Sequence, residues 1–286
     1  MSGKMSLFIG LRSAVTASLT AAAVVVGAGC RADSEAELGR VLSVLATDYA
    51  FEAPDQVEGG VVKIELRNDG PAEHHHVVLV RLPAGKTAVD FLSVKRETDQ
   101  PPSWAIHAGG LEPVDPGGEA EGTLILEAGE YLLICYVMTP GGVRHLELGM
   151  VRSLRVLEPT VGVREPEPDL ELSMFDYGYV LSDSLRSGRR TIRVVNGGPQ
   201  VHNVVVWKLD RGKHVEDVRA WYEEGRKGAP PGRRIGGMGG LSPGRHAYFT
   251  ADFEPGSYAF FCMVNDVGDG RPHIFHEMIL ELTIPT

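Results

Sequence analysis

One of the three cysteines in the chain ends an apolar segment, and a histidine and a methionine follow it at short range. The segment "YLLICYVMTPGGVRHLELGM" contains these residues as Cys135, His145 and Met150. A thiolate, an imidazole and a thioether are ligands that transition metals such as copper accept. A buried free cysteine also commonly acts as a small hydrophobe. These three residues alone do not decide between a metal site and a structural cluster.

The second half of the chain repeats the first half, and the repeat includes this cluster. The sequence "NDGPAEHHHVVLVRL" (68–82) matches "NGGPQVHNVVVWKL" (196–209), and "EAGEYLLICYV" (127–137) matches "EPGSYAFFCMV" (254–264), at an offset of 127 or 128 residues. A histidine also matches upstream, where His75, rather than His74 or His76, aligns with His202. The candidate metal ligands are His75, Cys135, His145 and Met150 in the first repeat, and His202, Cys262, His273 and Met278 in the second.

Two imidazoles, one thiolate and a weak axial thioether are the ligand set of a type 1 (blue) copper site. A cysteine that ends one strand and a methionine that begins the next let a single loop supply three ligands, while the remote histidine comes from a neighbouring strand. The sequence therefore predicts up to two coppers per chain, cycling between Cu(I) and Cu(II). Two alternatives stay open, namely repeats that keep these residues without metal, and a disulfide between Cys135 and Cys262.

In these motifs the sequence resembles the cupredoxin family, and the resemblance covers both repeats. The stretch His202-Asn203-Val204-Val205 matches the family's histidine-asparagine motif, and the four residues between His145 and Met150 match a plastocyanin-like spacing. The family's asparagine tethers the ligand loop by hydrogen bonds. His76 takes that position in the first repeat, so the resemblance leaves the tether there in question. The resemblance implies an all-β fold of two tandem Greek-key β-sandwich domains.

The hydrophobic pattern predicts which segments position these ligands. Short runs rich in β-branched residues, such as "GVVKIELRN" and "HNVVVWKL", are typical of strands, and short-interval strands favour an antiparallel sandwich or barrel. We expect one helix per repeat, over 87–97 and 214–225. The segments 101–118 and 228–244 are dense in glycine and proline and are expected to be loops. The predicted domains are 40–158 and 170–286, joined by a linker over 159–169.

The first 29 residues are typical of an export signal. Lys4 and Arg12 precede the apolar run "AVTASLTAAAVVVGAG", and the run ends at "GAGC". This ending resembles the lipobox of bacterial lipoproteins, in which Cys30 is lipidated, although Gly27 stands where a large aliphatic residue is usual. Ordinary signal cleavage is the alternative. We therefore expect a cell-envelope, periplasmic lipoprotein of a bacterium, anchored to a membrane through Cys30, with residues 30–39 as a tether.

The net charge and the residues that precede the two cysteines narrow the range of possible functions. The formal net charge of -10 argues against nucleic acid, which is bound through Lys and Arg. Ile134 and Phe261 precede the two cysteines, where multicopper oxidases and nitrite reductases place a histidine that reaches a catalytic copper. The sequence thus favours a non-enzymatic one-electron carrier with an unidentified redox partner protein. A copper buffering or delivery protein and a metal-free interaction module are the alternatives.

Overall fold

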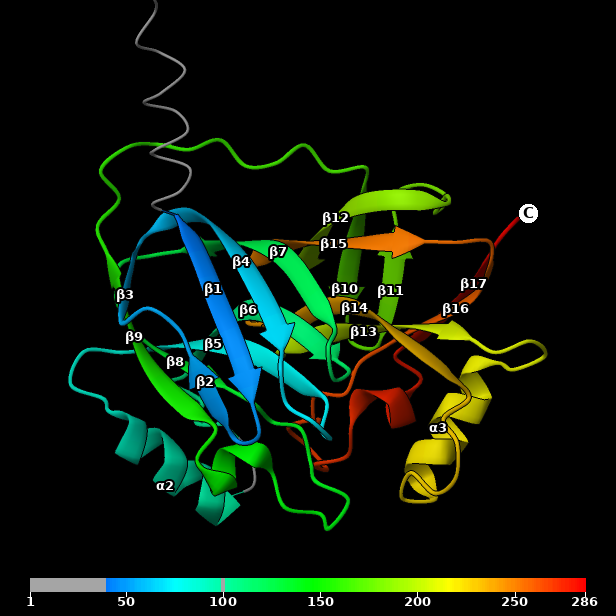
Figure 1. Cartoon of the computed structure of the whole chain (residues 1–286), viewed down its shortest axis with the longest axis horizontal. Helices are drawn as coiled ribbons and strands as arrows, with labels where there is room; N and C mark the ends of the chain where they lie inside the picture. Colours follow the sequence, from blue (N-terminus) through cyan, green and yellow to red (C-terminus); the bar gives the residue numbers. More distant parts are fainter. Residues whose placement is uncertain (1–39, 99–100) are drawn as a thin grey trace, which may run out of the picture.

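The computed structural model describes residues 40–98 and 101–286, so the predictions for the export signal, Cys30 and the 30–39 tether lie outside the described residues. The described chain is a sandwich of two large sheets, as the sequence predicts (Figure 1). The first repeat lies on the left of Figure 1 and the second on the right. No helix within the described residues is long and apolar enough to span a membrane.

The first sheet has eight strands in the order β11-β10-β12-β15-β7-β4-β1-β2. Two of its neighbouring pairs, β1 with β4 and β10 with β12, are parallel, so the expected antiparallel arrangement is only partly realised. The strands are β1 (Val41–Thr47), β2 (Ala50–Glu52), β4 (Gly60–Asn68), β7 (Glu119–Leu126), β10 (Leu170–Phe175), β11 (Gly178–Leu181), β12 (Gly188–Asn196) and β15 (His246–Phe253).

The second sheet has nine strands in the order β17-β16-β13-β14-β6-β5-β8-β9-β3. It contains the strands that carry the candidate ligands. The strands are β3 (Gln56–Glu58), β5 (His75–Leu82), β6 (Ile106–Val114), β8 (Gly129–Ile134), β9 (Val151–Leu157), β13 (His202–Leu209), β14 (Gly232–Leu241), β16 (Gly256–Phe261) and β17 (Ile279–Ile284).

Both sheets run without interruption from one repeat into the other. In the first sheet β7 of the first repeat pairs with β15 of the second, and in the second sheet β6 pairs with β14. Matching residues meet at these junctions, because Gly122 pairs with Phe249 and Leu111 with Met238, each at the repeat offset of 127. The two repeats are therefore related by an approximate twofold axis and share one continuous pair of sheets.

The junction strands correct one prediction from the sequence. Both glycine-rich segments that were expected to be loops contain a strand of the second sheet, β6 and β14. Glycine is required there because the neighbouring backbone comes very close. A Cβ atom on Gly110 would lie 2.0 Å from the carbonyl oxygen of Val77, and one on Gly237 would lie 2.0 Å from that of Val204. Glycine in a strand is typical of such close backbone approaches.

Each repeat has one helix where the sequence predicts it, and the two helices cover the outer face of the second sheet. They are α2 (Ala88–Thr98) and α3 (Val215–Glu223), and they are visible below the sheets in Figure 1. Phe91 of α2 packs against β5 and β8, and Val218 of α3 packs against β13 and β16. Strands β5 and β13 are thus buried on both faces. This explains why they are continuously apolar instead of alternating.

Candidate metal centres

The remote histidine of each site begins a central strand, and a buried asparagine orders the loop before it. Asn68 donates hydrogen bonds through its side-chain amide to the carbonyl oxygens of Glu73 and Val114, and its Oδ1 accepts from the N–H of Gly70. Asn196 repeats this arrangement in the second half. Each asparagine ties the loop before the ligand strand to its neighbour strand, which fixes where His75 and His202 begin β5 and β13.

The cysteine of each site directly follows the end of a strand. Alternation along β8 sends Ile134 to the helix side and Cys135 to the core between the sheets. The chain then returns through a short 3-10 helix, η1 (His145–Leu148), before β9. The N–H of Cys135 donates to the carbonyl oxygen of Met150, and the N–H of Met150 donates to that of His145. These bonds hold both ends of the ligand loop together.

The second repeat builds its loop with the same backbone bonds. Cys262 donates to the carbonyl oxygen of Met278, and Met278 donates to that of His273. The returning 3-10 helix is η2 (His273–His276). Two separate segments of sequence therefore fold into the same loop geometry around equivalent side chains.

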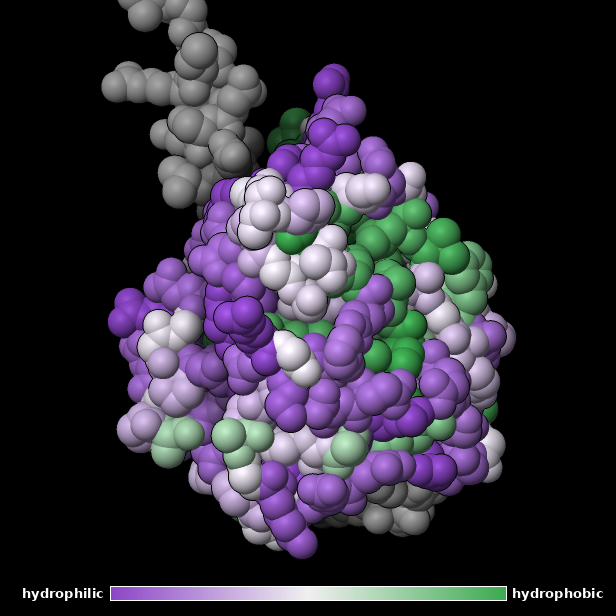
Figure 2. Space-filling view, turned by 90° about the vertical axis from the view of Figure 1, so that its right-hand side faces the viewer, coloured by the Kyte–Doolittle hydropathy of each residue, from purple (hydrophilic) through white to green (hydrophobic). Residues whose placement is uncertain are grey.

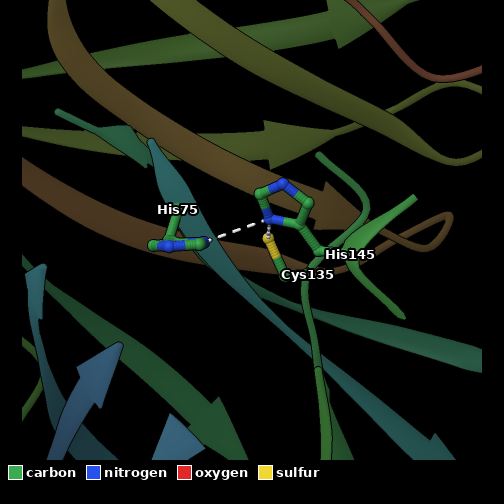
Figure 3. A group of neighbouring side chains, drawn as sticks. All are labelled: His75, Cys135 and His145. Atoms are coloured by element: carbon green, nitrogen blue, oxygen red, sulfur yellow. Dashed lines mark hydrogen bonds between the residues drawn. The ribbon is translucent and has the colours of Figure 1, made fainter. Parts of the chain in front are cut away.

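In the first repeat, His75, Cys135 and His145 point toward one another (Figure 3). The Nδ1 atoms of His75 and His145 are 3.1 Å apart, and the Sγ of Cys135 lies 3.5 Å from Nδ1 of His145. In Figure 3 the ring of His75 comes from β5, and the other two side chains come from the loop segment that follows β8. All three residues are fully buried.

The second repeat has a site of nearly identical dimensions. The Nδ1 atoms of His202 and His273 are 3.1 Å apart, and the Sγ of Cys262 lies 3.4 Å from Nδ1 of His273 and 3.9 Å from Nδ1 of His202. Cys135 and Cys262 are both free thiols, so the disulfide alternative is excluded in this structure.

These separations fit a single metal ion shared by each group. Nitrogen and sulfur ligands about 2.0 to 2.3 Å from one tetrahedral ion lie roughly 3.3 to 3.6 Å from one another. The separations between the two Nδ1 atoms, and from Sγ to the Nδ1 of His145 or His273, are close to this spacing, and the possible ligand atoms of each group all lie within 4.8 Å of one another. Met150 and Met278 are also fully buried, and each follows the second histidine of its group by five residues in the sequence.

The protonation of the converging groups suits metal binding. Burial raises the pKa of Cys135 to about 12 and that of Cys262 to about 12. Burial, together with the neighbouring ligand histidine, lowers the pKa of His145 to about 4 and that of His273 to about 4. At neutral pH these imidazoles are neutral and offer lone pairs, whereas each thiol keeps its proton until a metal displaces it.

A side chain next to each remote histidine tethers the loop after the cysteine. In the second repeat Oδ1 of Asn203 accepts a hydrogen bond of 2.8 Å from the N–H of Met263, as the resemblance implied. In the first repeat Nε2 of His76 accepts one of 2.7 Å from the N–H of Tyr136. The histidine at the asparagine position therefore makes the same tether, and the departure in sequence leaves the geometry intact.

An aspartate and a tyrosine that the sequence comparison missed cover the first site. Asp48 and Tyr49 form the turn between β1 and β2. The ring of Tyr49 packs edge-on against His145 with 5.0 Å between centroids, and Oδ1 of Asp48 lies 3.7 Å from Nε2 of His75. The latter distance is too long for a hydrogen bond.

Asp176 and Tyr177 form the equivalent turn between β10 and β11, and they contact the second site more closely. Oδ1 of Asp176 accepts a hydrogen bond from Nε2 of His202 at 2.5 Å, which leaves Nδ1 of His202 free for a metal. The ring of Tyr177 lies 5.2 Å from that of His273. The dipeptide Asp-Tyr recurs at an offset of 128, the offset of the matching asparagines, and this signal could have found the turn.

One further histidine, His276, lies near the second site without joining its His–Cys–His group. Its ring stacks on Tyr177 with 5.0 Å between centroids, and its Nε2 lies 3.1 Å from Oδ1 of Asp269. Asp266, Asp269 and His276 are close enough together for a metal ion. Oδ1 of Asp266, however, accepts hydrogen bonds from backbone N–H groups of its own turn, which gives it a structural role.

Comparison with known proteins gives weak matches to copper proteins. A dithionite-reduced auracyanin from Roseiflexus castenholzii is 19% identical over 41% of this chain and 97% of its own, with a TM-score of 0.31. Auracyanin A from Chloroflexus aurantiacus, a "blue" copper protein, is 23% identical over 41% of this chain and 99% of its own, with a TM-score of 0.28. A copper-containing nitrite reductase from Thermus scotoductus SA-01 is 15% identical over 85% of this chain and 61% of its own, with a TM-score of 0.23.

No protein-family model matches the chain, and no curated protein matches it. All of these matches are distant, and the chain's own features define the class of protein. These features are two sandwich repeats and the order of the converging histidine, cysteine and histidine. These features are consistent with a tandem cupredoxin-like protein. Each of its repeats contains one buried His–Cys–His group that could bind copper.

Proposed function

We propose that this protein is an exported one-electron carrier with a type 1 copper site in each repeat, in which Met150 and Met278 are the axial ligands. The observation that carries the proposal is the complete burial of both ligand sets, each formed by a histidine that begins a strand and a loop that supplies the other ligands. Copper bound in such a set supplies a one-electron Cu(I)/Cu(II) couple. The protein holds the imidazole and sulfur atoms in place, so that the geometry changes little between the two oxidation states.

The burial of the ligands favours electron transfer over copper delivery. A protein that hands copper to a partner must let that partner's ligands reach the metal, whereas here the two imidazoles, the thiol and the methionine of each repeat are fully buried. Ile134 and Phe261, the residues before the cysteines, pack in the apolar clusters beneath α2 and α3. Neither supplies an imidazole that could lead to a catalytic copper, which supports a carrier over an oxidase or a nitrite reductase.

The placement of the loops suits access by a redox partner. Both ligand loops, 135–150 and 262–278, lie at the lower end of the molecule in Figure 1, whereas the start of β1 and the 159–169 segment lie at the upper end. Exposed apolar side chains in the first ligand loop include Met138, Val143 and Leu148. The side view in Figure 2 is mostly hydrophilic, with one hydrophobic area toward its right. We propose that a redox partner protein docks at the loop end, away from the membrane.

The function is tested on residues 31–286 loaded with Cu(II). A carrier should show intense visible absorption from the copper–thiolate bond and should keep its copper through repeated reduction and oxidation in the presence of a chelator. Loss of copper at each reduction would support buffering or delivery instead. A protein that retains no copper after loading would support the metal-free interaction module.

Anchoring through Cys30 is also part of the proposal. Replacing Cys30 with Ala in the full chain should move the protein from the membrane fraction to the soluble exported fraction, because the lipid would no longer be attached. Fractionation and mass spectrometry of the mature N-terminus measure this. The lipobox interpretation is wrong if the variant stays with the membrane and the natural chain carries no lipid.

The two sites should differ in their dependence on the aspartate of the covering turn. Asp176→Asn keeps an acceptor for the N–H of His202 and removes a negative charge beside the second site. This charge favours Cu(II), so the second midpoint potential should rise by roughly 50 mV, as a screened charge interaction on the order of 1 kcal/mol implies. Asp48→Asn is the matched variant and should raise the first potential less, because Asp48 is farther from its histidine and more exposed. Equal shifts in redox titrations would contradict this.

A further inference from the structure

A single buried carboxylate lies at the junction of the two repeats. Glu112 is on β6, next to the residue at which β6 pairs with β14, and only 3% of its surface is exposed. Its counterpart at the repeat offset is Gly239, because Val114 and Leu241 make the same contact with Asn68 and Asn196. Since glycine has no side chain, the junction contains one carboxylate where an exact duplication would contain two.

This carboxylate faces the tether of each metal centre. One oxygen, Oε1, accepts a hydrogen bond of 2.7 Å from the side-chain amide of Asn203, and the other, Oε2, lies 4.0 Å from Nδ1 of His76. Asn203 accepts from the N–H of Met263, and His76 accepts from the N–H of Tyr136. Each of these amides belongs to the residue directly after a ligand cysteine. Glu112 is therefore hydrogen-bonded to the tether of the second ligand loop and lies within 4.0 Å of the tether of the first.

Glu112 lies beside the residue that follows the remote histidine of each site, Asn203 in the second repeat and His76 in the first. A buried charge is weakly screened by solvent, so its influence extends to both sites. A negative charge at this position favours Cu(II) over Cu(I) at a metal in either site, because Cu(II) carries the larger positive charge.

We propose that Glu112 is a positioning residue shared by the two metal centres, which aligns both ligand loops through Asn203 and His76 and lowers the reduction potential of both coppers. The part about potential rests on the copper sites proposed above. Because one side chain serves both sites, a change in it should alter both together, in contrast to the separate effects of Asp48 and Asp176.

The charge is tested with Glu112→Gln, which keeps the size and the acceptor oxygen and removes the charge. Redox titrations in Cys262→Ser and Cys135→Ser backgrounds report each copper by itself. Both midpoint potentials should rise relative to the same backgrounds with Glu112. Asp115→Asn is the control, since Asp115 lies on the same side of the junction but is exposed and paired with Arg234, and it should move neither potential. A rise at only one site, or at neither, overturns the shared role.

The alignment is tested without copper, by hydrogen exchange of backbone amides in the metal-free protein. Glu112→Ala leaves Asn203 and His76 without their common neighbour, so the amides of Met263 and Tyr136 should both exchange faster. Glu112→Gln should keep the Met263 amide protected, because its amide oxygen can still accept from Asn203. Unchanged exchange at both amides in Glu112→Ala overturns the positioning role. This result is independent of copper, so it stands even if the proposed copper function fails.

Discussion

Replacing either ligand cysteine with serine should remove one copper and leave the other. The loaded protein is expected to hold two coppers, and Cys135→Ser and Cys262→Ser are each expected to hold one. A serine hydroxyl does not ionise to give the soft thiolate that copper prefers, while the remaining imidazoles at that site bind more weakly. Metal analysis per chain and the visible absorption of the copper–thiolate bond measure the loss, and the absorption should fall by about half.

The control is Met174→Leu, which removes a fully buried sulfur from β10 at a distance in sequence from either ligand loop. It should leave both coppers in place. The double cysteine variant should bind neither. Two coppers in both single variants would contradict the ligand assignment, since the metal would then be held by other residues.

The internal duplication made most of the fold predictable. A repeated pattern shows which residues are equivalent. A helix or strand that the pattern of one repeat predicts only weakly is therefore supported by the pattern at the equivalent residues of the other repeat. The helices over 88–98 and 215–223, and the strands that begin at His75 and His202, lie where the pattern placed them. Strands β5 and β13 are continuously apolar because each is buried on both faces. One face packs in the core between the sheets, and the other packs against a helix.

The glycine-rich segments were misjudged for a physical reason. Glycine is typical of turns, and composition alone does not distinguish a turn from a strand that another backbone approaches closely. In β6 and β14 the close neighbours are the strands β5 and β13, which are distant in sequence. That approach depends on which strands pair within each folded repeat, and no local pattern encodes it.

Some residues of the candidate sites could be predicted from the repeat, and others could not. The ligands were predictable because they recur in register, and Asp48-Tyr49 and Asp176-Tyr177 could have been found by extending the same comparison. Glu112 could not, because its counterpart is Gly239 and a search for repeated residues passes over it. Its role arises from the junction between the repeats, where one copy of a residue lies close to both sites.

The junction glycines support the strongest prediction about folding. A Cβ on Gly110 would lie 2.0 Å from the carbonyl oxygen of Val77, and the φ of Gly110 is +154°. Gly110→Ala therefore forces β5 and β6 apart, and we expect it to lower the free energy of unfolding by about 4 kcal/mol or more. Gly117→Ala is the control, because Gly117 has a φ of +76° and no atom within 4 Å of the added Cβ. Left-handed backbone strain alone should cost about 1 kcal/mol there.

Alanine substitutions of the two junction glycines, Gly110 and Gly237, should each affect a different metal centre. Gly110 pairs with Val78 of β5, the strand that begins with His75, whereas Gly237 pairs with Val205 of β13, the strand that begins with His202. Displacing β5 should weaken copper binding in the first repeat, and Gly237→Ala should weaken it in the second, each measured in the background that retains only the affected site. Chemical denaturation gives the stability of each variant. If Gly110→Ala is no less stable than Gly117→Ala, the close approach of β5 to β6 does not exist in solution. Other contacts must then position the strand that begins with His75.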